Sequence, residues 1–84
     1  WKPITNINDP KIQGLGQCAV HEQDRLGGDH LIFINVVRGR QRGEMTYELV
    51  INASERESDC YKAVVFNFDL NKPEYCRLLS FDDC

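Results

Sequence analysis

The sequence has 84 residues, of which 10 are Lys or Arg and 13 are Asp or Glu, so its formal net charge is −3 at pH 7. This length suits one domain, and we expect residues 1–84 to fold around one small core. The acidic balance argues against a nucleic-acid partner. No apolar run approaches the roughly 18 residues of a spanning helix, so we expect no membrane partner. No signal peptide is recognisable, so a secreted form would have lost it or carry it outside this sequence.

The cysteine content indicates how so small a core is stabilised. Four cysteines in a short chain favour two disulfides and an oxidising compartment, as for a secreted protein. Four reduced thiols or a zinc site are the alternatives. No two cysteines have C-x-x-C spacing, which disfavours zinc, and we expect neither a metal nor another cofactor.

The first third of the chain predicts a short strand and one helix. Residues 1–7 are consistent with an edge strand, because Pro3 is tolerated there. Asp9 and Pro10 are typical of a helix start, and Gly27 with Gly28 of a helix end, which predicts a helix over residues 10–26. The apolar residues that share one face of this helix are Ile12, Leu15, Ala19 and Val20. Gly14 and Gly16 weaken the helix, which suggests that a sheet passes close to it.

The rest of the chain predicts four strands joined by short turns. The strands are residues 31–37, 45–51, 60–70 and 75–81, and the turns are residues 38–43, 54–59 and 71–74. Alternation in the second of these strands and just beyond it puts one set of residues on one face: Tyr47, Leu49, Ile51 and Ala53. The aromatic residues of the last two strands are interpreted as core and cross-strand pairs: Phe66, Phe68, Tyr75 and Phe81. Short turns make neighbouring strands antiparallel, so we expect an α+β fold with one helix across a four- to five-stranded antiparallel sheet.

Several stretches resemble the cystatins, most closely those of plants. Plant cystatins carry a Leu-Ala-Arg-Phe-Ala-Val-x-Glu-His-Asn type signature on their helix, and residues 15–24 read Leu-Gly-Gln-Cys-Ala-Val-His-Glu-Gln-Asp. Further similarity lies at Trp1-Lys2-Pro3-Ile4, Tyr47-Glu48-Leu49, Tyr61-Lys62-Ala63-Val64-Val65 and Leu79-Ser80-Phe81. The resemblance covers the whole chain in register and implies a cystatin/monellin-like fold.

The resemblance also implies a function. Cystatins inhibit papain-type cysteine proteases reversibly, by filling the protease cleft with an N-terminal trunk, a Gln-x-Val-x-Gly hairpin and a Pro-Trp hairpin. The matching positions here are Trp1 for the trunk, Gln41 and Gly43 for the first hairpin, and Pro73 for the second. The central Val is absent, and Glu74 replaces the Trp. A lost interface Trp can cost about 2 kcal/mol or more, so we expect weakened inhibition.

A second function remains open at this point. The chain could be a non-inhibitory cystatin-fold module with a structural, defence or binding role, such as one unit of a phloem filament-like protein. No nucleophile, base or carboxylate pair forms a catalytic constellation, so we expect a non-enzyme in either case.

The predicted strand ends suggest a cysteine pairing. Cys60 begins one strand and Cys84 follows the next, and these ends adjoin in an antiparallel hairpin. We therefore expect a Cys60–Cys84 bond, which leaves Cys18–Cys76, although four cysteines allow three pairings. A cross-link between two chains through Cys84, and hence self-association, is the alternative.

Other polar features allow two interpretations each. Arg38, Arg40 and Arg42 form either a solvated turn or a contact for an acidic surface or anionic glycan. Asn52 opens an Asn-Ala-Ser sequon and is a candidate glycosylation site. His21 and His30 are expected to face solvent rather than to act as ligands or bases.

Overall fold

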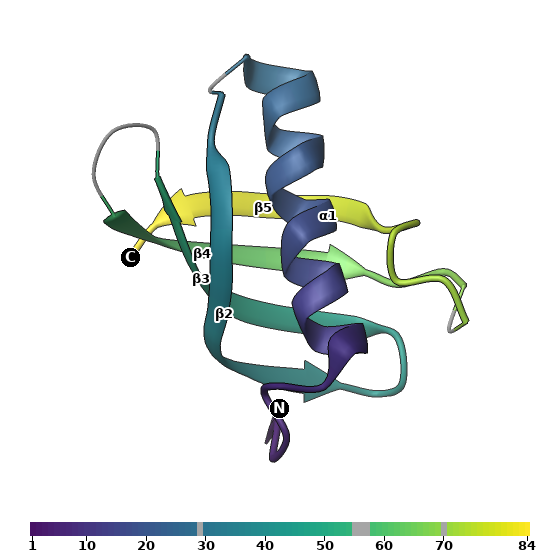
Figure 1. The fold of residues 1–84 in the computed structure, drawn as a ribbon. Helices are drawn as coiled ribbons and strands as arrows, with labels where there is room; N and C mark the ends of the chain where they lie inside the picture. Colours follow the sequence, from purple (N-terminus) through teal and green to yellow (C-terminus); the bar gives the residue numbers. More distant parts are fainter. Residues whose placement is uncertain (29, 55–57, 70) are drawn as a thin grey trace.

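The computed structural model describes residues 1–28, 30–54, 58–69 and 71–84. One helix lies across a five-stranded antiparallel sheet whose strand order follows the chain (Figure 1). The elements are β1 (Lys2–Pro3), α1 (Pro10–Gly27), β2 (Ile32–Arg42), β3 (Thr46–Ser54), β4 (Ser58–Phe66) and β5 (Arg77–Asp83). This arrangement confirms the α+β, cystatin-like class expected from the sequence.

The ends of α1 depend on the residues that predicted them. The Asp9 carboxylate accepts the backbone N–H of Lys11 at 2.9 Å, which satisfies one free donor of the first turn. Gly28 takes the left-handed conformation, with φ 67°, and its N–H donates to the Asp24 carbonyl at 2.8 Å. The predicted apolar face is confirmed, since all four residues are buried: Ile12, Leu15, Ala19 and Val20.

The two glycines inside α1 allow close approach of different partners. A Cβ on Gly16 would overlap Val36 Cγ2 and lie 2.9 Å from Phe33 Cε1, so β2 passes against the helix there, as expected. A Cβ on Gly14 would lie 3.2 Å from Pro73 Cγ. The neighbour of Gly14 is therefore the β4–β5 loop and not the sheet.

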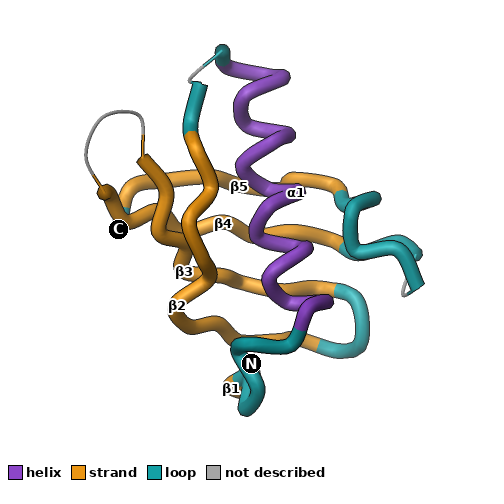
Figure 2. Tube along the Cα trace, viewed as in Figure 1, coloured by secondary structure: helices purple, strands orange, loops and turns teal. Residues whose placement is uncertain are grey.

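Only one face of the sheet is covered by α1, as Figure 2 shows. The predicted core face of β3 is confirmed, because each of these side chains is at most 2% exposed: Tyr47, Leu49, Ile51 and Ala53. Intervening side chains, such as Glu48 and Val50, lie on the opposite face. We call this opposite face the open face.

The predicted turn at residues 38–43 is wrong. β2 continues through Arg42, which pairs with Thr46, and the reversal occupies residues 43–45. Ladder pairing with β3 on one side and β1 on the other extends this strand beyond its apolar run. The predicted strands 60–70 and 75–81 also shift: β4 ends at Phe66 and β5 begins at Arg77, while β1 is only two residues long.

A polar residue of α1 fastens the helix to the sheet. Gln13 Nε2 donates to the carbonyl oxygens of Ile7, at 2.7 Å, and Val36, at 3.1 Å. Its Oε1 accepts the Val36 N–H at 2.9 Å. Val36 lies beside a register shift in the β2–β3 ladder, so Gln13 satisfies backbone groups at an irregular point of β2.

The one helix in the described residues, α1, does not combine the length and the apolar character that crossing a membrane requires.

Candidate functional site

The short β2–β3 turn and the longer β4–β5 loop meet at one end of the molecule (Figure 1). The β2–β3 turn, residues 43–45, and the β4–β5 loop, residues 67–76, are joined where the Asn67 N–H donates to the Met45 carbonyl at 2.7 Å. Pairing of Lys2 with Gln41 brings the N-terminal strand to the same end. We call this end the loop edge.

Four large apolar side chains are exposed at the loop edge, and we call them the apolar tips. Their exposed fractions are Trp1 41%, Met45 36%, Phe68 56% and Tyr75 53%. The interpretation of Phe68 and Tyr75 as core or cross-strand residues is therefore wrong. The chain leaves the sheet after Phe66 and rejoins it at Arg77, so both residues lie in the loop. By contrast, Phe81 stacks on Tyr61 with ring centroids 5.2 Å apart, as a cross-strand aromatic should.

The β2–β3 turn is shaped by the residues that were expected to contact a protease. Gly43 has φ 65°, which other residues adopt only with strain. Half-buried Gln41 donates from Nε2 to the Tyr47 hydroxyl at 3.4 Å, and that hydroxyl donates to the Glu44 carbonyl at 3.1 Å. Gln41 thus lies on the covered side of β2 and stabilises the turn from within.

Trp1 is held by two arginines of β2. The guanidinium carbons of Arg40 and Arg42 lie 4.9 Å and 4.5 Å from the Trp1 ring centroid. Arg40 also donates two hydrogen bonds to Glu48, at 2.9 and 3.1 Å, which lower the pKa of that carboxyl. The ring borders a hollow of about 450 Å³ that Lys2 and Gly43 also line. The aromatic tip is therefore positioned before any partner arrives.

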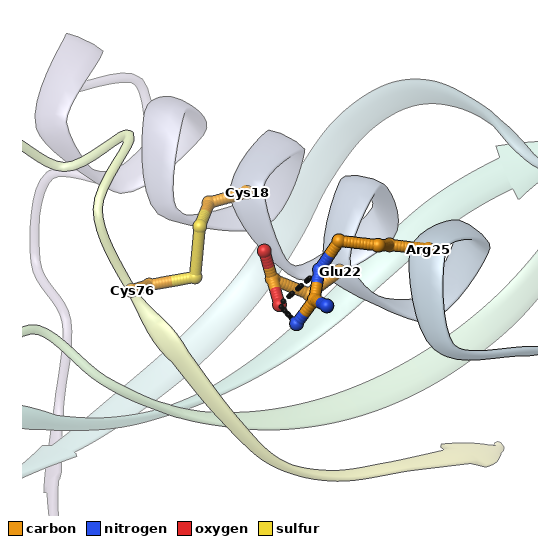
Figure 3. Close-up of a disulfide and its surroundings, with 4 residues drawn as sticks. All are labelled: Cys18, Glu22, Arg25 and Cys76. Carbon is orange, nitrogen blue, oxygen red and sulfur yellow. Dashed lines mark hydrogen bonds and ion pairs between the residues drawn. A yellow bond between two sulfur atoms is a disulfide. The ribbon is translucent and has the colours of Figure 1, made fainter.

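The β4–β5 loop is fastened to α1. Cys18 and Cys76 form a disulfide with their Cα atoms 6.2 Å apart, as Figure 3 shows. Pro73 packs on Gly14 one turn earlier in the helix. Pro73 therefore faces the helix, and the exposed groups of this loop include Glu74 and the two aromatic tips. One turn beyond Cys18, Arg25 pairs with Glu22 at 2.7 Å and lowers the pKa of that carboxyl (Figure 3).

The second disulfide lies at the opposite end of the sheet. Cys60 and Cys84 are bonded, and the Cys84 N–H donates to the Cys60 carbonyl at 3.1 Å. The structure thus has the same two pairs that the strand ends suggested. Only Cys18–Cys76 belongs to the loop edge.

The remaining residues singled out in the sequence are separated from the apolar tips or only border them. Arg38, Arg40 and Arg42 share the open face of β2, opposite Val50, Glu48 and Thr46. Asn52 is half-buried in mid-sheet, between Asn35 and Cys60. His21 and His30 are both exposed, as expected.

Metal binding has no support in this geometry. Within residues 1–28, 30–54, 58–69 and 71–84, no group of three or more His, Cys, Asp or Glu side chains could hold a metal ion.

Comparison with known proteins gives one family and several plant relatives. A family model described as aspartic acid proteinase inhibitor matches residues 4–84. Cysteine proteinase inhibitor 6 of Oryza sativa subsp. japonica is 40% identical over 88 residues, covering 98% of this chain and 76% of that protein. Cysteine proteinase inhibitor 8 of the same plant is 41% identical over 70 residues, covering 79% of this chain and 57% of that protein.

A third relative comes from kiwifruit. Cysteine proteinase inhibitor 1 of Actinidia chinensis var. chinensis is 35% identical over 71 residues, covering 82% of this chain and 56% of that protein. The chain therefore spans between 56% and 76% of the length of these three relatives. No solved structure matches the chain significantly.

Proposed function

Because the chain belongs to the aspartic acid proteinase inhibitor family, within the cystatin-like inhibitors of plants, we propose that it is a reversible inhibitor that blocks the substrate cleft of an aspartic proteinase through its loop edge. Residues 1–84 act in this proposal as one inhibitory domain. The protein performs no chemistry on the proteinase and needs no cofactor. It excludes substrate by occupying the cleft.

The observation that carries this proposal is the set of apolar tips gathered at one end of a rigid sheet. Exposed large apolar groups on the loops at one end of a sheet are typical of a contact surface, since burying them in a partner is favourable. Trp1 is held by the β2 arginines and the β4–β5 loop by Cys18–Cys76. Groups fixed in advance lose little entropy on docking, which favours tight binding.

Several features favour an aspartic proteinase over a papain-type cysteine protease. The family description names the former. The β2–β3 turn lacks the central Val of the cystatin hairpin, Glu74 occupies the place of its Trp, and Pro73 packs on Gly14. Papain-type inhibition is the second candidate, because relatives such as the rice protein carry the name cysteine proteinase inhibitor. We propose that this activity is weakened here.

The cysteines support a proposal about the compartment. Two disulfides are compatible with an oxidising environment. We propose that the protein is secreted or stored in such a compartment in a plant, where inhibiting foreign proteinases would serve defence.

Steady-state inhibition by the oxidised chain tests the proposal. Pepsin and papain are assayed in parallel, with inhibitor titrated to tens of micromolar and folding verified by circular dichroism at both assay pH values. We expect submicromolar inhibition of pepsin and at least a hundredfold weaker inhibition of papain. The reverse order would support the papain-type candidate. Inhibition of neither enzyme by the folded chain would support the non-inhibitory module instead.

A further inference from the structure

We propose that the arginine strip, formed by Arg38, Arg40 and Arg42 on the open face of β2, binds carboxylates of an acidic segment on the target proteinase. Arg38 and Arg42 supply the contacting charges, and Arg40 and Arg42 both lie against the Trp1 ring. This inference rests on the proposed inhibitory function and names the chemistry of the surface beside the blocked cleft.

The strip has a regular spacing. Its three arginines occupy alternate positions of β2 and therefore project to the same face of the sheet. At about 3.3 Å per residue, the backbone positions of Arg38 and Arg42 are roughly 13 Å apart. That interval matches carboxylates about four residues apart along an extended partner segment, so both guanidinium groups can engage one segment.

Only the outer two arginines carry charge that a partner can use. Arg40 is bound through two donors to Glu48, whose side chain is only 17% exposed. Arg38 and Arg42 make no ion pair with any described residue, and both are exposed. A guanidinium group matches a carboxylate in shape and charge. The strip is thus locally cationic in a chain of net charge −3.

The surface between the arginines suits a peptide better than a glycan. A hollow of about 360 Å³ is lined by Arg38, by Arg40 with the Glu48 that it binds, and by Pro3, Ile4 and Val50. Apolar lining between cationic groups can hold the methylene groups of acidic side chains and their aliphatic neighbours. An anionic glycan presents charge but little apolar surface. An acidic protein segment therefore fits both the cationic groups and the apolar lining of this site.

The arginine strip adjoins the apolar tips at Trp1. Arg42 lies 4.5 Å from the Trp1 ring, and β2 carries the strip away from the loop edge toward Arg38. A partner that covers Trp1 therefore brings the rim of its cleft over the arginines. Charges at an interface rim mainly raise the association rate and select partners of opposite charge.

The test uses poly-L-glutamate as probe, titrated into the oxidised, ¹⁵N-labelled chain at pH 7 and low salt. We expect amide shifts concentrated in residues 38–43, and affinity that falls steeply with added salt. The Arg38→Gln, Arg42→Gln double variant should bind at least about fivefold more weakly, which corresponds to a loss of about 1 kcal/mol. Lys72→Gln with Arg77→Gln removes the same charge from the β4–β5 side of the loop edge and should change affinity less than twofold.

Three outcomes would overturn the inference. They are unchanged binding by the Arg38 and Arg42 double variant, an equal loss in the Lys72 and Arg77 control, and binding of a heparin oligosaccharide to the strip where poly-L-glutamate does not bind. The titration contains no proteinase, so its failure is distinct from failure of the inhibition assay. Poly-L-glutamate binding without proteinase inhibition would support the carboxylate site and contradict the proposed function. Proteinase inhibition without poly-L-glutamate binding would support the proposed function and contradict the carboxylate site.

Discussion

The backbone N–H of Asn67 donates to the carbonyl oxygen of Met45 at 2.7 Å and thereby joins the β2–β3 turn to the β4–β5 loop at the loop edge. The Asn67 side chain is fully buried, yet neither of its amide atoms has a hydrogen-bond partner among the residues that the structure describes. A buried amide without partners costs free energy, commonly about 1–3 kcal/mol. The backbone hydrogen bond thus stabilises the junction between the loops, whereas the unpaired amide of the Asn67 side chain destabilises the fold.

Replacing Asn67 with Leu should stabilise the protein. The change keeps the volume similar, removes the unpaired amide and leaves the backbone bond to Met45 intact. We expect the free energy of unfolding in urea to rise by about 1–3 kcal/mol. Asn71→Leu, at an exposed position of the same loop, is the control and should bring no gain. An unchanged or lower free energy for Asn67→Leu would mean that the amide is satisfied in solution.

The two disulfides should differ in function although both stabilise the fold. Their loops of 58 and 24 residues correspond to roughly 4 and 3.5 kcal/mol in the loop-entropy treatment. Removing Cys18–Cys76 by two Ala substitutions frees the β4–β5 loop from α1, so inhibition should weaken at least tenfold at a temperature where the variant is folded. Removing Cys60–Cys84 should lower stability and leave inhibition within about twofold. Equal losses of inhibition would contradict the role given to the loop.

Gly16 should tolerate no side chain, whereas Gly14 should. Gly→Ala inside a helix ordinarily gains up to about 1 kcal/mol. At Gly16 the new Cβ would overlap Val36, and we expect a net loss of about 1–3 kcal/mol in the free energy of unfolding. At Gly14 the neighbour is Pro73 at 3.2 Å, which a small loop shift relieves, so the change should be near neutral. Urea unfolding of both variants checks this, and a stable Gly16→Ala protein would contradict the close packing of β2 on α1.

The Arg40–Glu48 pair predicts a small pH dependence of stability. The hydrogen bond from Arg40 lowers the folded-state pKa of Glu48 below its ordinary value. Its stabilisation is therefore complete above the unfolded pKa, about 4.3, and is lost as pH falls through the lower folded value. The free energy of unfolding of the wild type should exceed that of Glu48→Gln by at most about 1 kcal/mol at pH 7. This difference should shrink as the pH falls. A difference that grows on acidification would refute this assignment.

Local patterns in the sequence were enough to predict the helix, its ends and the core face of β3. Asp9 and Gly28 cap the helix through hydrogen bonds to residues two to four positions away. The alternation around Leu49 follows because only one face of the strand is covered. The cysteine pairs followed because Cys60 and Cys84 close neighbouring strand ends. These features depend on contacts within one element or between neighbouring strands, except for Cys18–Cys76, which remained once Cys60 and Cys84 were paired.

Features of the loop edge depend on tertiary contacts and could not be predicted in this way. Phe68 and Tyr75 continue apolar strand patterns, and only the observed ends of β4 and β5 place them in the loop. The segment with the β2 arginines was predicted to be a turn, because the local sequence does not show its pairing with β1 and β3. Gln13 gave no signal at all, since its partners are backbone groups of Ile7 and Val36.

The measurement that tests the account most directly is the inhibition constant for pepsin of single variants at the apolar tips. Phe68→Ala and Tyr75→Ala remove exposed rings that the fold does not need, so each should weaken inhibition at least tenfold without changing the free energy of unfolding. Leu26→Ala is the control, because Leu26 is 64% exposed at the far end of α1 and should be neutral. Inhibition unaffected at Phe68 and Tyr75, or reduced equally by Leu26→Ala, would contradict the loop edge as the surface that blocks the proteinase.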